Sequence, residues 1–365
     1  MKNNIRFKNL LKKMEEHNID YFMIAPSDNL RSLLGFSPGK CERFQALFIK
    51  NNGDYFYISP QIYYEEISEL ISEEKIFVWK DREGHTDLLK KLINKFNISN
   101  VKIAVDNSIS SVNTIEITNL TEVTWYNGHD LIEELRIIKD SEEQKLLKES
   151  ALLADKVMDK AINFIKPGIR EYDIKSKIKE EAFKLGGDGV AFEPIIASGA
   201  NSSKPHYNKS DREIKGQDIV LLDLGVIYKG YCSDISRTIF VGEITSRQEE
   251  IYNIVKKSTE AAKNILEPGI QAAELDHASR KVISKAGYGD CFLNRLGHGI
   301  GMSVHEAPYI NGNNDRALKP GMAFSIEPGI YLPDEFGIRI EDIVIVTKAG
   351  FEVLNEYNRD IIINS

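Results

Sequence analysis

Two stretches of this 365-residue chain share one layout, and both place acidic residues inside a predicted β-hairpin. Residues 215–238 and 319–346 each begin with a basic residue and a glycine, continue as an apolar strand that ends in an acid, turn, and return with a second acid. Short apolar runs bounded by turn residues are typical of buried strands. The four acids, one on each arm of the two hairpins, are Asp223, Asp234, Glu327 and Glu341.

A second pair of similar stretches supports an internal duplication. Residues 161–169, AINFIKPGI, and residues 262–270, AKNILEPGI, have the same helical pattern and the same ending. We therefore expect two related halves that deliver one hairpin and two carboxylates each to a common centre. If only one such hairpin were present, its two acids could equally lie in solvent at the end of the hairpin. Carboxylates that face one another inside a sheet repel and lose hydration, so either a cation lies between them or they point apart.

A glycine-rich stretch with a histidine precedes the second hairpin. His298 stands in the sequence LGHGIG at residues 296–301. This is not a dinucleotide-binding fingerprint, because the third glycine comes too early and no strand-to-helix frame surrounds it. Glycine permits close approach of the main chain, which an imidazole needs in order to reach a crowded centre. A lone histidine is more often a satisfied core residue, but beside four carboxylates we interpret His298 as a metal ligand.

Four carboxylates and one imidazole are a suitable ligand set for two divalent cations. Oxygen ligands with one nitrogen favour Mn²⁺ or Co²⁺, and Fe²⁺ or Zn²⁺ would also fit. Two such ions lower the pKa of a shared water and make a nucleophile at neutral pH. We expect His206 and His305 to donate to a substrate carbonyl or its oxyanion, and Arg339 to hold a ligand carboxylate by a bidentate contact.

The first third of the chain alternates helices and strands, which predicts an α/β domain. Helical periodicity covers residues 5–17, 86–97 and 109–119. Strands are predicted at residues 21–25, 46–49, 55–58, 76–79 and 101–105. The alternation ends near Asn127-Gly128, and residues 129–162 have the period of one long charged helix. We therefore predict two domains, residues 1–128 and 129–365.

The composition excludes several classes of protein. A hydrophobic content of 42% and a charged content of 28% are ordinary for a protein with a sizeable core. The formal net charge of −8 argues against a nucleic-acid-binding surface. The N-terminus lacks the apolar core of a signal peptide, and no apolar run is long enough to span a bilayer. The three cysteines have neither disulfide nor metal spacing, so we expect a cytoplasmic protein that binds neither nucleic acid nor membrane.

The chain resembles the pita-bread metallopeptidases, in particular the branch that contains Xaa-Pro dipeptidase (prolidase) and aminopeptidase P. The motifs that carry the resemblance are IIASGANSSKPHY, LLDLGVIYKGYCSDISRT, RLGHGIGMSVHEAP, MAFSIEPGIY and GIRIEDIVIV. The first 128 residues resemble the N-terminal domain that this branch shares with creatinase, most clearly in IDYFMIAPSDNLRSLLGF. The resemblance implies an α+β protein, with a creatinase-like N-terminal α/β domain followed by a pita-bread catalytic domain made of a duplicated α/β unit.

The resemblance also implies roles for individual residues. One metal ion would be held by Asp234, His298, Glu327 and Glu341, and the other by Asp223, Asp234 and Glu341, so that Asp234 and Glu341 bridge the two ions. Glu327 would also assist proton transfer. The implied activity is hydrolysis of Xaa-Pro bonds in small peptides with proline at the second position, by an Xaa-Pro dipeptidase that forms a homodimer.

Three alternatives share the same fold. An Xaa-Pro aminopeptidase acts on longer peptides with the same catalytic core. Aminopeptidase P has an additional histidine four residues before the ligand histidine, and this chain has Asn294 there. A creatinase-like hydrolase is metal-free and lacks the full acidic ligand set, which is complete here. Non-enzymatic binding proteins of this fold lose ligands and gain basic tails or insertions, whereas this chain keeps all five candidate ligands and is acidic.

Overall fold

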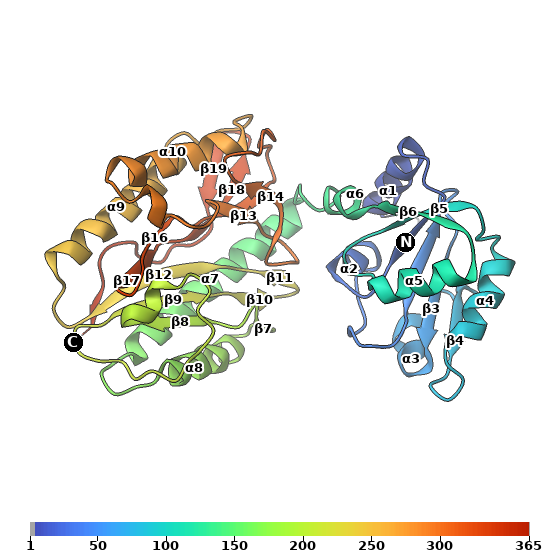
Figure 1. Cartoon of the computed structure of the whole chain (residues 1–365), viewed down its shortest axis with the longest axis horizontal. Helices are drawn as coiled ribbons and strands as arrows, with labels where there is room; N and C mark the ends of the chain where they lie inside the picture. The colour runs from blue at the N-terminus through green and yellow to red at the C-terminus, as the bar shows by residue number, and fades with distance from the viewer. Residues whose placement is uncertain (1–3, 365) are drawn as a thin grey trace. The chain divides into compact units, whose positions relative to one another are not determined.

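The computed structural model describes residues 4–364 and separates into two compact units, Met1–Arg136 and Ile137–Ser365 (Figure 1). The strands β1 to β6 belong to the first unit, and all elements from α7 onward belong to the second.

The first unit is a six-stranded sheet with helices on both faces (Figure 1). The strand order is β4-β3-β2-β1-β5-β6, in which β1 is antiparallel to β2 and parallel to β5. The strands are β1 (Tyr21–Ile24), β2 (Ala46–Lys50), β3 (Tyr55–Pro60), β4 (Ile76–Trp79), β5 (Val101–Val105) and β6 (Val123–Asn127). The helices are α1 (Ile5–Glu16), α2 (Asp28–Leu34), α3 (Tyr64–Ser68), α4 (Thr86–Lys95), α5 (Ser111–Leu120) and α6 (His129–Glu133), with 3₁₀ turns η1 (Gln61–Tyr63) and η2 (Glu73–Lys75).

Local sequence signals placed these elements well. The strands predicted at 76–79 and 101–105 are confirmed as β4 and β5, and the hairpin predicted before and after residues 51–54 is confirmed as β2 and β3. Helix α1 begins after Asn4, whose side chain accepts a hydrogen bond from the N–H of Arg6 and so caps the helix. The predicted α/β arrangement of this unit is therefore confirmed.

The single long helix predicted over residues 129–162 is wrong. The chain forms the short helix α6, breaks, and starts again as α7 (Ser141–Phe164). The new start is a capping box: the Asp140 side chain accepts from the N–H of Glu143, and the Glu143 side chain accepts from the N–H of Asp140. Because Ile132 of α6 belongs to the apolar core of the first unit, that unit extends through α6 and beyond the boundary predicted between residues 128 and 129.

The second unit is built from two similar halves (Figure 1). In the first half, helices α7 and α8 are followed by strands β8, β9 and β12; in the second, α9 and α10 are followed by β13, β15 and β18. The sheet orders β12-β9-β8 and β18-β15-β13 correspond strand for strand. The elements after α7 are α8 (Glu171–Lys184), β7 (Gly189–Val190), β8 (Ile195–Ser198), η3 (Gly199–Ser203), β9 (Ile219–Leu224), β10 (Val226–Tyr228), β11 (Tyr231–Cys232), β12 (Ile235–Val241), α9 (Ser246–Lys263), α10 (Ala272–Lys285), η4 (Gly289–Cys291), β13 (Gly297–Gly299), β14 (Glu306–Ile310), β15 (Ala323–Ile326), β16 (Gly329–Leu332), β17 (Phe336–Arg339), β18 (Asp342–Thr347), β19 (Gly350–Val353) and β20 (Ile363–Asn364).

The loops between paired helices share an equivalent main-chain hydrogen bond. The N–H of Gly168 donates to the carbonyl of Ile214 at 2.9 Å, and the N–H of Gly269 donates to the carbonyl of Leu318 at 2.7 Å. Both glycines have φ near +90° (89° and 98°), which other residues rarely adopt. The duplication predicted from the two similar sequence stretches is therefore confirmed in the main-chain geometry.

Each acid-bearing hairpin leaves the main sheet of its half. In the first half β9 pairs with β12, and beyond that pairing β10 pairs with β11. In the second half β15 pairs with β18, and β16 pairs with β17. The return arm of the first hairpin consists of two strands, β11 and β12, with Ser233 and Asp234 between them. The return arm pairs with β10 before this point and with β9 after it, and Asp234 lies where the pairing partner changes.

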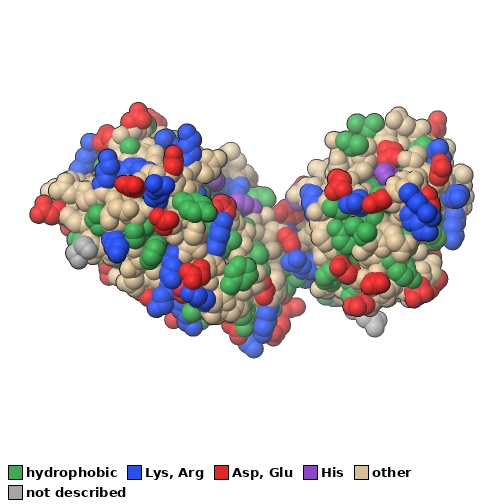
Figure 2. Space-filling view, turned by 90° about the horizontal axis from the view of Figure 1, so that it is seen from below, with side chains coloured by type: hydrophobic (Ala, Val, Ile, Leu, Met, Phe, Trp, Pro, Cys, Tyr) green, Lys and Arg blue, Asp and Glu red, His purple; other side chains and the backbone are tan. Residues whose placement is uncertain are grey.

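The two halves have separate apolar cores under their helices. On the face shown in Figure 2, lysine and arginine side chains intermingle with aspartate and glutamate side chains. Within residues 4–364, no helix is both long enough and apolar enough to cross a membrane.

Candidate metal centre

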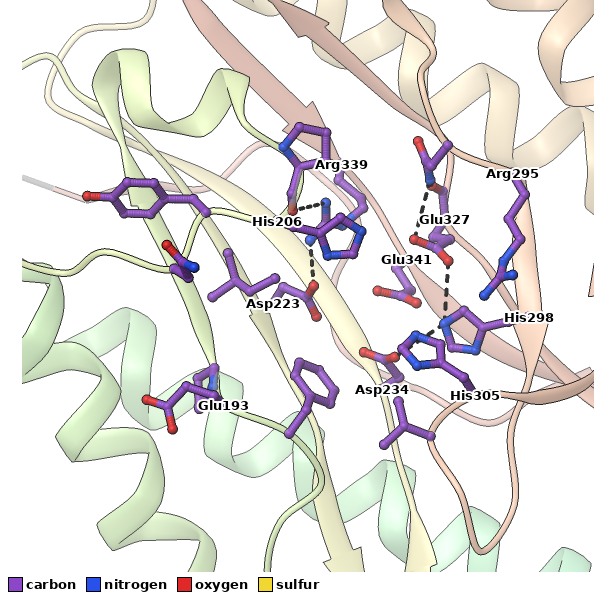
Figure 3. Close-up of a pocket in the computed structure, with 18 of the residues that line it drawn as sticks. Glu193, His206, Asp223, Asp234, Arg295, His298, His305, Glu327, Arg339 and Glu341 are labelled. Carbon is purple, nitrogen blue, oxygen red and sulfur yellow. Dashed lines mark hydrogen bonds and ion pairs between the residues drawn. The ribbon is translucent and has the colours of Figure 1, made fainter. Parts of the chain in front are cut away.

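The four acids predicted as ligands meet where the hairpins leave the two sheets (Figure 3). Asp223 lies on β9 and Asp234 between β11 and β12, whereas Glu327 lies between β15 and β16 and Glu341 between β17 and β18. Each half therefore contributes one acid from its outgoing strand and one from its returning strand. Asp223, Asp234 and Glu341 are buried, and the Glu327 side chain is 16% exposed.

His298 on β13 completes this group. Ligand atoms of Asp234, His298 and Glu341 all lie within 4.8 Å of one another. The His298 Nε2 atom is 3.7 Å from an Asp234 oxygen and 3.4 Å from a Glu327 oxygen. Its Nδ1 atom is 3.1 Å from the carbonyl oxygen of Gly299, which is the contact of an Nδ1–H donor. That tautomer leaves the Nε2 lone pair directed at the acids, as metal coordination requires.

Glycines beside His298 permit this approach. A Cβ atom on Gly297 would lie 1.9 Å from the carbonyl oxygen of Ser325, and one on Gly299 would lie 2.2 Å from the carbonyl oxygen of Ala307. Neither position can hold a side chain without displacing the neighbouring strand. The prediction that the glycines serve close main-chain approach around His298 is confirmed.

The carboxylates of the centre make few hydrogen bonds to other residues of the protein. One oxygen of Asp223 and one oxygen of Asp234 are buried and have no hydrogen-bond partner among the residues that the structure describes. Burial, followed by the neighbouring carboxylates, raises the pKa of Asp234 and of Glu341 well above the ordinary value. Burial also raises the pKa of Glu327 to about 7. Such a group of acids is favourable in ionised form only if cations neutralise it.

The donor set therefore fits divalent cations. Burial lowers the pKa of His298 to about 3, so its imidazole is neutral and available as a ligand at neutral pH. Four carboxylates would neutralise two dications, and the buried oxygens of Asp223 and Asp234 that have no hydrogen-bond partner among the described residues could each donate a lone pair to a metal ion. The structure brings all five predicted ligand residues around one space, and their individual coordination remains a prediction.

Arg339 holds Asp223, but not by the predicted bidentate contact. One terminal nitrogen of Arg339 lies 2.5 Å from an Asp223 oxygen, and the other lies 2.7 Å from the hydroxyl of Tyr331. The Nε–H donates to the hydroxyl of Ser236 at 2.8 Å. The guanidinium is shared among four partners, the fourth being the carbonyl of Pro205 at 3.4 Å, so only one of its nitrogens contacts the carboxylate.

The other two predicted histidines, His206 and His305, lie beside the same group of acids (Figure 3). The ring centroids of His305 and His298 are 4.2 Å apart, and the two rings are arranged edge to face with an interplanar angle of 67°. His206 follows the short helix η3. Both histidines are exposed and both line one cavity with the acids, so they could reach a bound molecule without entering the group of ligands.

This cavity has a volume of about 670 Å³ and takes side chains from both halves of the second unit. Its apolar wall includes Phe192, Ile195 and Val304. The sequence analysis missed Arg295 and Tyr331, which also line the cavity. Their position within the motifs RLGHG and EPGIY was the available signal, but neither residue type by itself indicates a site.

Fold and centre together define a class: a hydrolase whose two sheets converge on a carboxylate-rich metal site beside a substrate-sized cavity. The chain belongs to metallopeptidase family M24, whose sequence profile matches residues 145–348. The profile of the creatinase/prolidase N-terminal domain matches residues 6–138. The predicted fold class and the predicted metallopeptidase activity are thereby confirmed.

Similarity to individual proteins extends over nearly the whole chain. The Bacillus subtilis protein YkvY, which carries a provisional dipeptidase name, is 38% identical over 93% of this chain and 94% of its own length. The crystal structure of prolidase from Thermococcus sibiricus is 34% identical, with a TM-score of 0.95 and 98% of each chain covered. An X-Pro aminopeptidase from Thermotoga maritima is 30% identical, with a TM-score of 0.83 over 98% of this chain and 99% of its own.

Proposed function

We propose that this protein is an Xaa-Pro dipeptidase that uses two divalent metal ions, and that it cleaves small peptides with proline at the second position. The observation that carries the proposal is a group of buried acids, two with unpartnered oxygens, at the side of a cavity of about 670 Å³ in an M24 metallopeptidase. The prolidase from Thermococcus sibiricus, which has a TM-score of 0.95 with this chain, supports the substrate class.

In this proposal Asp234 and Glu341 would help to hold both ions. Asp223 would complete the ligands of one ion, and His298 and Glu327 those of the other. Ions held in this way supply the chemistry of two-metal hydrolases, which lower the pKa of a water so that it attacks at neutral pH. The placement of these residues at corresponding strand ends of two duplicated halves supports a shared site.

The protein's own groups then orient the substrate and move protons. His305 and His206 would donate hydrogen bonds to the scissile carbonyl as negative charge develops on its oxygen. Glu327, which lines the cavity beside His298, would exchange a proton with the attacking water and the leaving nitrogen. Arg339 would keep Asp223 aimed at the centre through its 2.5 Å contact.

An Xaa-Pro aminopeptidase is the second candidate, because the catalytic centre is common to both activities and the Thermotoga maritima enzyme is similar over the whole chain. Asn294 favours the dipeptidase. Its amide donates to the main-chain carbonyl of Glu327 at 3.2 Å, in the position where aminopeptidase P has an additional histidine. The side chain at this position therefore touches the Glu327 segment.

Steady-state hydrolysis of Ala-Pro, Ala-Pro-Ala and Ala-Ala, measured after chelation and after addition of Mn²⁺ or Co²⁺, tests the proposal. We expect no cleavage after chelation, restored cleavage with metal, and a higher kcat/KM for Ala-Pro than for the other two peptides. Full activity in metal-free protein would contradict the metal centre. Preference for Ala-Pro-Ala would establish the aminopeptidase instead.

Three further properties complete the proposal: Mn²⁺ or Co²⁺ as the metal, a homodimer, and a cytoplasmic location. The oxygen-rich ligand set supports the choice of metal. Cys41, Cys232 and Cys291 form no disulfide within the described residues, which is compatible with a reducing compartment. Metal analysis of protein purified without added metal, and light scattering coupled to size exclusion, test the first two properties.

A further inference from the structure

Strand β12 contains three consecutive polar residues that are completely buried. Ser236, Arg237 and Thr238 each have 0% exposure, although the strand is otherwise apolar. Buried polar groups destabilise a protein unless all their hydrogen bonds are made. The partners of these three residues therefore indicate what the strand is built to hold.

All three residues bind the segment of the second half that leads into β18. The Ser236 hydroxyl donates to a carboxylate oxygen of Glu341 at 2.7 Å and accepts from Arg339. The Thr238 hydroxyl donates to the carbonyl of Arg339 at 3.0 Å. The N–H of Glu341 donates to the carbonyl of Ser236 at 3.1 Å. The junction between the two halves thus lies directly behind the metal centre.

Arg237 makes the most extensive contacts at this junction. One terminal nitrogen bridges two carbonyl oxygens, that of Ser236 at 2.9 Å and that of Glu341 at 2.6 Å. The other binds the Asp342 carboxylate at 2.8 Å and the carbonyl of Tyr357 at 2.9 Å, and the Nε–H reaches the carbonyl of residue 358 at 2.7 Å. These bonds occupy the donor positions of the guanidinium on all sides.

The duplicated fold does not itself require an arginine at this position. Asp223 and Glu327 are corresponding acids, and the residues just before them, Leu222 and Ile326, pair across their sheets with Arg237 and Asp342. An arginine thus occupies this position in the first half, and an acid occupies it in the second. The arginine is therefore a specialisation of one half, and its contacts lead to the carboxylates that both ions would share.

We propose that Arg237 is a positioning residue of the metal centre. By holding the carbonyl of Glu341 beside the carbonyl of Ser236, it fixes the separation between the Asp234 and Glu341 carboxylates, which come from different halves. This inference rests on the proposed two-metal function. A lysine keeps the positive charge at this site but has no planar fork that could bridge two carbonyl oxygens and a carboxylate together.

Equilibrium titration of metal-free protein with Co²⁺, followed by visible absorption and calorimetry, tests the inference in the full-length chain. In Arg237→Lys we expect at least tenfold weaker binding of one Co²⁺ ion, a changed Co²⁺ absorption spectrum, and a lower kcat with KM nearly unchanged. Arg237→Gln, which keeps a planar amide but loses the charge, should show the same direction of change.

Asp155→Asn is the matched control. Asp155 is a buried acid that accepts from the N–H of Tyr357 at 3.1 Å, so it holds the same C-terminal segment, but its hydrogen bonds are to that segment. We expect this variant to lose thermal stability while it binds Co²⁺ within twofold of the parent. Melting temperatures are recorded for all variants.

Parental Co²⁺ affinity and spectrum in Arg237→Lys would overturn the inference, as would an equal loss of affinity in Asp155→Asn. Failure of both Arg237 variants to fold would also overturn it, because Arg237 would then be required by the fold rather than by the centre. If the parent protein itself bound no Co²⁺, the proposed two-metal function would be refuted instead, which keeps the two failures distinct.

Discussion

Without metal, ionisation of the buried acids should lower the free energy of unfolding as the pH rises. Comparison of the parent with Glu327→Gln measures the part of this loss that is due to Glu327. Burial raises the pKa of Glu327 from 4.5 to about 7, with Arg339 opposing the change. Between these values the unfolded chain releases a proton that the folded chain retains, so the free energy of unfolding falls with rising pH and levels off above pH 7. At about 1.4 kcal/mol per pKa unit, the total loss is about 3 kcal/mol.

Urea unfolding followed by circular dichroism at several pH values between 4 and 8 tests this value, with a chelator present throughout. Both tryptophans, Trp79 and Trp125, lie in the first unit, so fluorescence would report on the wrong part of the chain. Relative to Glu327→Gln, the parent should lose about 3 kcal/mol of unfolding free energy across this range. With saturating Mn²⁺ the loss should disappear, because bound ions stabilise the ionised carboxylate.

A pH-independent difference between parent and Glu327→Gln, constant within about 1 kcal/mol, would refute the reasoning, since one pKa unit alone is worth more than that. It would mean that Glu327 is already ionised in the metal-free fold. An increase in stability toward pH 8 would be a stronger contradiction, because it would require a lowered pKa for a buried carboxyl beside other acids.

Three further predictions concern the centre and its support. Asp234→Asn should bind fewer than two metal ions per chain, and its kcat should fall far more than its substrate affinity. Normal metal content together with normal turnover would show that Asp234 does not bridge two ions. His298→Ala should fail at metal binding, whereas His206→Ala and His305→Ala should retain metal but turn over roughly 10²–10³-fold more slowly; if these two variants turned over normally, the substrate would bind elsewhere. Gly297→Ala places a Cβ 1.9 Å from a main-chain oxygen of β15 and should lower the melting temperature strongly; an unchanged melting temperature would mean that the strands separate easily.

The acids of the centre were predictable from sequence because each one ends or begins a strand in a repeated pattern. Hydrophobic runs, turn residues and the spacing of Asp223 and Glu327 are local properties, and the structure places both where the outgoing strands end. The glycines around His298 were predictable for a similar reason, since their only plausible use was close main-chain approach.

Other features were missed because they depend on contacts between distant segments. The helical period of residues 129–162 hid the capping box at Asp140, although the Asp-x-x-Glu signal was present. The bidentate contact expected of Arg339 was wrong because Ser236 and Tyr331 also compete for its guanidinium. No local pattern reveals how many partners a buried arginine will have.

By itself the sequence determined the duplication, the two acidic hairpins and the ligand types, because strand period, turn chemistry and residue identity act over a few neighbouring positions. Only the tertiary structure decided how the two halves meet. The separation of Asp234 from Glu341 depends on the hydrogen bonds that join β12 to the segment before β18, including the bond from Arg237 to the carbonyl of Glu341. Those contacts join residues about a hundred positions apart, and their geometry exists only once both halves have folded and packed together.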